Sequence, residues 1–87
     1  MDDYKAATIN VDTNGTELNP SFDIENWSVY TAGGNFTVEV STVAGVWGDA
    51  IPGISGIGLS MSIACQRIRI KSAVGTIAVN YVINGSL

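Results

Sequence analysis

The chain has 87 residues, of which 46 % are hydrophobic and 14 % are charged, and it contains one cysteine and no histidine. A chain of this length forms one domain with a small core, and a single cysteine excludes an internal disulfide. The absence of histidine argues against zinc sites and most acid-base catalysis. We therefore expect no catalytic residues, no cofactor and no metal, and a binding or structural role.

Charge is distributed unevenly along the sequence. Residues 1–49 hold all eight acidic residues and Lys5, a net charge of −7, whereas residues 50–87 hold only three basic residues, a net charge of +3. The total of −4 repels phosphate, so we expect no nucleic-acid partner. No apolar run approaches the length of a membrane span and the first residues lack a signal-peptide pattern, so we expect a soluble protein made in a cytoplasm, with no membrane partner.

The whole chain is predicted to form strands, because β-branched, aromatic and glycine residues dominate and no segment has a helical period. A first strand is predicted over residues 5–13, followed by a type I′ hairpin turn at Asn14-Gly15. The oxygen-rich run 12–17 departs from EF-hand spacing, which favours a turn over a calcium site. We expect residues 1–26 to form an N-terminal arm and residues 27–87 the body of the single domain.

The body begins with alternating strands. Trp27 and Val29 start one strand, Gly33-Gly34 supplies a turn, and a second strand has an apolar face and a polar face predicted to meet solvent. The apolar face is Phe36, Val38 and Val40, and the polar face is Thr37, Glu39 and Ser41. A glycine-rich loop over 43–58 is predicted to contain an edge strand at 47–51, and two final strands are predicted at 59–71 and 76–83.

The strongest chemical feature is a basic stripe in the first of these two final strands. Arg67, Arg69 and Lys71 share one strand face, and Ile68 and Ile70 share the other, because side chains alternate along a strand. Two interpretations are open. The stripe pairs within the fold with Glu39 or another acid, or it docks onto an acidic neighbour such as the N-terminal half of an identical subunit.

Exposed aromatic side chains would allow sugar stacking. Trp27, Tyr30, Trp47 and Tyr81 are the candidates, and core packing is favoured for most of them. Trp47 is the best exception because it lies in the glycine-rich loop. Asp23 and Glu25, two residues apart on one strand, cannot converge across a cleft as a glycosidase requires, which further favours a non-enzymatic protein.

The order of patterns from Trp27 to Ile83 resembles a module of tailed-bacteriophage virion proteins. The corresponding segments are Phe36-Thr37-Val38-Glu39-Val40, Val46-Trp47-Gly48, Gly58-Leu59-Ser60-Met61-Ser62, Arg67-Ile68-Arg69-Ile70 and Gly75-Thr76-Ile77-Ala78-Val79. The resemblance implies a small antiparallel, jelly-roll-like β-sandwich used in capsid decoration (cement), head fibres or tails, commonly trimeric and without catalytic residues. Ala44-Gly45-Val46 stands where an Asp-Gly dipeptide usually precedes the tryptophan.

The leading expectation is therefore a non-enzymatic phage decoration protein of the virion, a homotrimer that binds the major capsid protein and stabilises the head. Its expected interface residues are Arg67, Arg69, Lys71, Trp47, Ile51 and Ile54. The alternative is a carbohydrate- or receptor-binding module of a tail fibre, with Trp47 and Tyr30 as stacking platforms.

Overall fold

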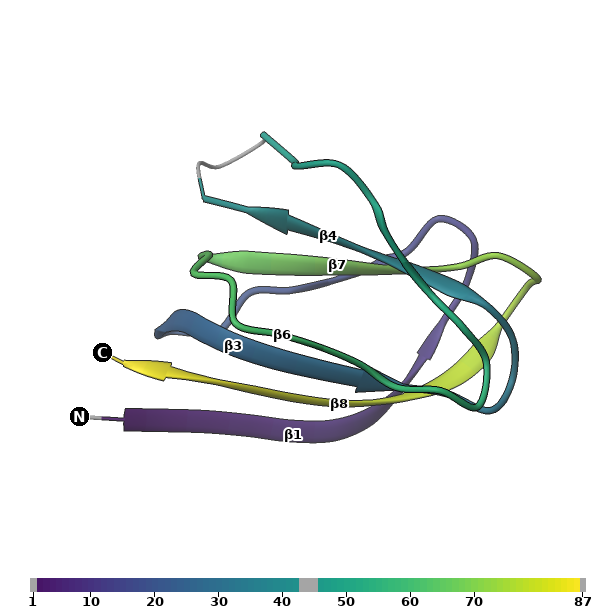
Figure 1. The fold of residues 1–87 in the computed structure, drawn as a ribbon, viewed down its shortest axis with the longest axis horizontal. Coiled ribbons are helices and arrows are strands. Elements are labelled where there is room, and N and C mark those ends of the chain that lie inside the picture. Colours follow the sequence, from purple (N-terminus) through teal and green to yellow (C-terminus); the bar gives the residue numbers. More distant parts are fainter. Residues whose placement is uncertain (1, 43–45, 87) are drawn as a thin grey trace.

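The described residues form eight strands, arranged as two antiparallel four-stranded sheets packed face to face (Figure 1). This computed structural model describes residues 2–42 and 46–86, with the side chains of 5–42 and 46–85. The strands are β1 (Asp2–Val11), β2 (Thr16–Leu18), β3 (Asp23–Tyr30), β4 (Phe36–Ser41), β5 (Ile51–Gly53), β6 (Leu59–Met61), β7 (Arg67–Ser72) and β8 (Ile77–Ser86). The prediction of an all-β antiparallel sandwich is confirmed.

The strand order is that of a jelly roll. One sheet, called sheet A, has the order β1-β8-β3-β6, and the other, sheet B, has the order β2-β7-β4-β5. The chain crosses from one sheet to the other at every connection except β4 to β5, which places sequence neighbours in opposite layers. In the described part of the chain, no helix is long and apolar enough to cross a membrane.

The segment 1–26, expected to be an arm, runs through both sheets. Its β1 pairs with β8 over all ten of its residues, and its β2 pairs with β7. The start of β1 and the end of β8 lie beside each other at one end of the sandwich (Figure 1).

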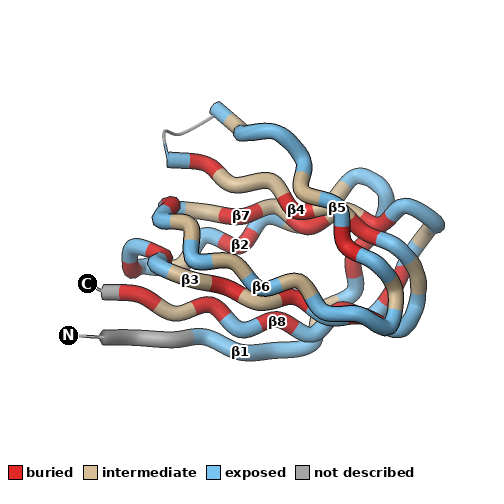
Figure 2. Tube along the Cα trace, in the orientation of Figure 1, coloured by how far each residue is buried: buried red, intermediate tan, exposed pale blue. Residues whose placement is uncertain are grey.

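The core lies between the sheets and is built by alternate residues of each strand (Figure 2). Trp27 and Tyr81 belong to it, which confirms core packing for these two aromatics. The buried hydrophobic residues are Val11, Leu18, Phe22, Ile24, Trp27, Val29, Phe36, Val38, Cys65, Ile68, Ile70, Ile77, Val79, Tyr81 and Ile83.

The polar face predicted for β4 is only partly exposed. Ser41, predicted to meet solvent, is buried, because residue 66 crosses beside it and the Gln66 N–H donates to the Ser41 carbonyl at 2.8 Å. The segment after β4 also returns along it, with the Gly48 N–H donating to the Val40 carbonyl at 2.8 Å. This face of β4 is therefore partly covered by the chain itself.

The turn at Asn14-Gly15 is present, but the predicted hairpin is wrong. β1 and β2 lie in different sheets, and only Gly15 has a positive φ, 93°, whereas a type I′ turn needs two such residues. The turn is closed by Asp12, whose Oδ1 accepts from the N–H groups of Asn14 and Gly15 at 2.9 and 3.1 Å. The Asp12 side chain of the oxygen-rich run therefore stabilises the turn in which the chain passes from sheet A to sheet B.

The single strand predicted over 59–71 is also wrong, because it is two strands in different sheets. β6 pairs with β3 in sheet A, β7 pairs with β4 in sheet B, and residues 62–66 connect them. Cys65 makes an isolated bridge to Ile24 on the way. The edge strand predicted at 47–51 is displaced to β5, and residues 43–45 of the loop lie outside the described part of the chain.

Candidate binding surfaces

The basic stripe lies on the outer face of sheet B, where Glu39 pairs with two of its three residues. Glu39, opposite Arg69 on the neighbouring β4, accepts two hydrogen bonds from Arg69 Nε and Nη2, each at 3.1 Å. The Lys71 Nζ lies 3.2 Å from the Glu39 Oε1. The fold thus confirms the first interpretation for Arg69 and Lys71, whose charges are paired within the chain.

The electrostatics of Glu39 follow from this geometry. The Arg69 hydrogen bonds, helped by Lys71 and opposed by burial, hold the pKa of the Glu39 carboxyl below its usual 4.5. Its side chain is only 14 % exposed, so the pair is partly shielded from solvent. Arg67, the third basic residue, is half-buried, and no hydrogen-bond partner of its Nε occurs within the described residues.

Trp47 joins this cluster from the loop after β4. Its ring lies over the Arg69 guanidinium, 4.3 Å from ring centroid to Cζ, a cation–π contact. Arg69 is therefore held by Glu39 and by Trp47 together. Trp47 is half-buried, because one side of its ring is covered by Arg69 of the same chain.

Tyr30 lies on the other side of the molecule, so the two proposed sugar platforms do not form one site. It follows the buried Val29 in β3, faces outward from sheet A and is 43 % exposed. Its cross-strand partner on β8 is Asn80, whereas Trp47 contacts Arg69 on sheet B. Sequence alone could not show this separation, because the sheet to which each segment belongs is a property of the topology.

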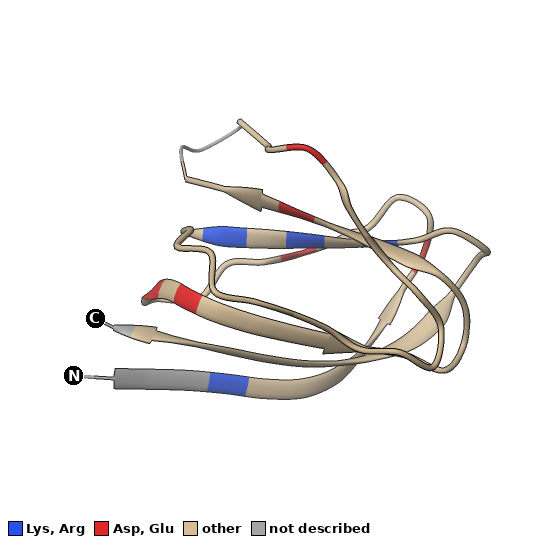
Figure 3. Cartoon of the chain, in the orientation of Figure 1, with Lys and Arg blue, Asp and Glu red and all other residues tan. Residues whose placement is uncertain are grey.

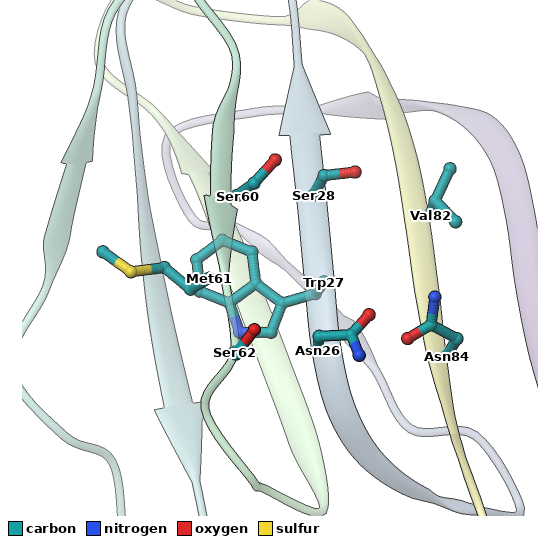
Figure 4. Close-up of a pocket in the computed structure, with 8 residues that line it drawn as sticks. All are labelled: Asn26, Trp27, Ser28, Ser60, Met61, Ser62, Val82 and Asn84. Atoms are coloured by element: carbon teal, nitrogen blue, oxygen red, sulfur yellow. The ribbon is translucent and has the colours of Figure 1, made fainter.

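The outer face of sheet A carries two open, shallow depressions. One, of about 240 Å³, is lined by Asn26, Trp27, Ser28, Ser60, Met61, Ser62, Val82 and Asn84 (Figure 4). The other, of about 250 Å³, is lined by Ser28, Val29, Tyr30, Gly58, Ser60, Asn80, Tyr81 and Val82. They share lining residues on β3, β6 and β8, so they adjoin.

The apolar interface residues expected in the loop have different surroundings. Ile51 is half-buried and packs against the core, while Ile54 is 58 % exposed. Beside Ile54 the structure adds two residues that sequence reasoning missed, Ile57 at 63 % and Val74 at 64 % exposure. These three form what we call the apolar loop end.

Asn35 holds the two loops of the apolar loop end together. Its Oδ1 accepts from the Ser55 N–H at 3.0 Å, and its carbonyl accepts from the Ala73 N–H at 2.9 Å. The signal that could have revealed this surface is isoleucine or valine directly beside turn glycines, where a side chain has little core to reach.

Metal-binding chemistry has little support in the side chains. The sequence has no histidine, and no group of three or more Cys, Asp or Glu side chains within the described residues could hold a metal ion. Cys65 is 5 % exposed, and burial raises the pKa of its thiol to about 11.

Comparison with known proteins identifies the fold and no family. No family model and no curated protein matches the chain. A structure from the Bacillus endospore appendages, described as a family of disulfide-linked pili, matches with a TM-score of 0.66 and 17 % identity over 100 % of this chain and 88 % of that one. FeII HppE matches with a TM-score of 0.61 and 9 % identity over 92 % of this chain and 43 % of that one. At these identities the likeness is one of fold alone.

Proposed function

We propose that this protein is a non-enzymatic structural subunit that associates with copies of itself and coats or builds a larger particle. The observation that carries the proposal is the open edge of β1. The strand is ten residues long and pairs on one side with β8, and its other edge meets no strand among the described residues. An exposed edge of this length is a template for pairing with another chain.

The other three sheet edges are short by comparison. β2, β5 and β6 have three residues each, and β5 contains Pro52. β1 has no proline and no break in its register; Asp2, Asp3 and Lys5 stand in its first four residues, and residues 6–11 carry no charge. Proteins usually interrupt or charge a long edge that must stay unpaired, so the uninterrupted and uncharged stretch 6–11 favours a partner strand.

Two further surfaces support association. The apolar loop end exposes three branched aliphatic side chains whose burial would stabilise a contact by roughly 25 cal/mol per Å² before entropic costs. Arg67, Arg69 and Lys71 remain interface candidates, with Glu39 reducing the net charge they offer. Their attraction for an acidic partner would therefore be weaker than that of three unpaired cations.

Two kinds of particle fit this proposal. The sequence resemblance favours a phage virion, with the chain as a trimeric decoration protein on the major capsid protein. The fold likeness to an endospore pilus subunit favours a filament or surface appendage. In either case the subunits would be held by non-covalent contacts, since the one cysteine of this chain is buried in the core.

The test is the assembly state of the purified chain. We expect light scattering and negative-stain electron microscopy to show oligomers whose mass rises with protein concentration. Replacing Ala6 and Ala7, both exposed on β1, with lysine should shift the association midpoint to at least about tenfold higher concentration, because like charges from two copies would meet at the edge.

A charge-matched control separates edge pairing from a general effect of added charge. Ala32 and Ala73 are exposed in the loops at the end of the sandwich, and their double lysine variant adds the same charge away from β1. A wild-type chain that stays monomeric at every concentration contradicts the proposal. Assembly lost in the loop variant and kept in the β1 variant would place the contact at the apolar loop end instead.

A further inference from the structure

Among the described side chains, the middle of the outer face of sheet A is uncharged, while Asp23 of β3 lies at one end of the sheet. The outward side chains of this middle part are Ala6, Thr8 and Asn10 of β1, Ala78, Asn80, Val82 and Asn84 of β8, Asn26, Ser28 and Tyr30 of β3, and Ser60 of β6. The outer face of sheet B, by contrast, carries Glu17, Glu39, Arg69 and Lys71. Figure 3 shows the same division, with the middle of sheet A free of blue and red.

The lack of charge defines what this face can bind. A partner that covers these side chains removes water from hydroxyl and amide groups, and these groups then need hydrogen-bond partners. It does not have to supply opposite charges, because it covers no ions. Phosphate, sulfate and carboxylate ligands find no cation among these side chains. The face suits a neutral ligand rich in hydroxyl and amide groups.

We infer that the two adjoining depressions on this face bind a neutral oligosaccharide, with Tyr30 stacking on one sugar ring. Among the described side chains, Tyr30 is the exposed aromatic residue of the face, and Gly58 beside it adds no side chain that would cover the ring. A Cβ at Gly58 would lie 3.9 Å from the Tyr30 Cδ2, so any larger residue would fill this space. Aromatic rings stack on the apolar face of a pyranose.

Hydrogen-bonding groups surround the ring in a defined orientation. The Thr8 hydroxyl donates to the Asn80 Oδ1 at 2.6 Å, which leaves the Asn80 amide nitrogen as a donor beside Tyr30, its cross-strand neighbour. Ser28 and Ser60, opposite each other on β3 and β6, line both depressions. A chain of two sugar units would place one ring on Tyr30 and the next over the serines.

The second depression supplies amides for that next unit. Asn26 and Asn84 are cross-strand partners, and their side chains lie next to each other at its edge (Figure 4). A second copy of the protein is a poorer occupant, because the centre of a protein interface needs apolar area and the large exposed apolar side chains described on this face are Tyr30 and Val82.

The experiment is saturation-transfer difference NMR, which works on the full chain whether or not it assembles. The probes are maltotetraose, cellotetraose and chitotriose, tested separately at millimolar concentration. We expect a saturable signal with at least one of these sugars. Tyr30→Ala should raise the dissociation constant about tenfold and so remove the signal, whereas Tyr30→Phe, which preserves the ring, should keep it. The Trp47→Ala variant should bind as the wild type does, because Trp47 lies in the loop after β4 and contacts Arg69 of sheet B, away from this face.

Two results would overturn the inference. One is the absence of saturable transfer from all three sugars; the other is binding that Tyr30→Ala leaves unchanged. Scattering mass is measured on the same variants. If Tyr30→Ala dissociates the oligomer while no sugar binds, the face is covered by a second copy. Self-assembly through β1 is tested by the lysine variants and does not depend on sugar binding, so each proposal can fail alone.

Discussion

Single residues decide what the charged face of this molecule can do. Arg69, the middle residue of the basic stripe, is held by the Glu39 carboxylate and the Trp47 ring. A strand pattern predicts which face a side chain occupies, and it left pairing with Glu39 open as one of two interpretations, but it cannot decide that β4 lies beside β7 with Glu39 directly opposite Arg69. The cluster therefore stabilises the fold, and only the positive charge that Glu39 does not neutralise is left to attract a partner.

Glu39→Gln should lower stability in a pH-dependent way. We expect a loss of about 1 to 2 kcal/mol near neutral pH, because two charge-assisted hydrogen bonds and an ion pair are weakened at a partly buried site. The folded-state pKa of Glu39 is lowered from 4.5, so its carboxylate stabilises the fold fully above 4.5 and loses that effect as the pH falls through the lowered pKa. Urea unfolding at neutral and acidic pH measures this difference.

Glu17→Gln is the matched control for this prediction. Glu17 lies in the same cross-strand row, opposite Arg69 on the other side, but it is exposed. Its variant should differ from wild type by less than about 0.5 kcal/mol at either pH. If Glu39→Gln shows the same small, pH-independent change, Glu39 contributes no more than an ordinary surface acid.

At the scale of elements, β5 shows how a short edge strand is fixed to the core. Gly53 is buried opposite Phe36, and a Cβ there would lie 2.2 Å from the Phe36 Cζ and 2.3 Å from its Cε2. Gly53→Ala should therefore destabilise the protein by about 1 to 3 kcal/mol through overpacking. Chemical denaturation is the measurement, and Gly48→Ala is its control, since the nearest atom to that Cβ is the Val40 carbonyl oxygen at 3.5 Å. Equal stability of the two variants would mean that β5 does not pack over the Phe36 ring.

The elements also show which parts of the fold could be predicted. Alternation gave the inward faces of β4, β7 and β8 correctly, because a buried face leaves a period-two signature. The break between β6 and β7 was readable too: Leu59, Met61 and Ile63 fall on odd positions, and Ile68 and Ile70 on even ones. One continuous strand cannot point both the odd and the even residues into the core. The change from odd to even apolar positions therefore indicates that the chain passes from one sheet to the other between them. The side-chain cap at Asp12 could not be read in this way, since Asn-Gly is equally typical of a hairpin.

For the whole molecule, the jelly-roll topology brings distant segments together and thereby creates the surfaces discussed here. The chain closes its sandwich by pairing β1 with β8, and this places a ten-residue edge at the border of the outer face of sheet A, the middle of which is uncharged among the described side chains. Neither the edge nor the face is continuous in sequence. Function at this scale therefore depends on contacts that composition and spacing do not specify.

The last prediction concerns how copies of the molecule are held together. Cys65 is 5 % exposed between the sheets and its thiol pKa is raised to about 11, so it is both inaccessible and protonated at neutral pH. We expect reducing agent to leave the oligomer mass unchanged, and a thiol-specific reagent to modify the native chain about two orders of magnitude more slowly than the chain in urea. A mass that falls on reduction, or a native thiol that reacts at the unfolded rate, would instead require Cys65 to reach the surface and join subunits covalently. The two measurements together decide between an assembly built on strand edges and side-chain burial and one built, like the pili that share this fold, on disulfide links.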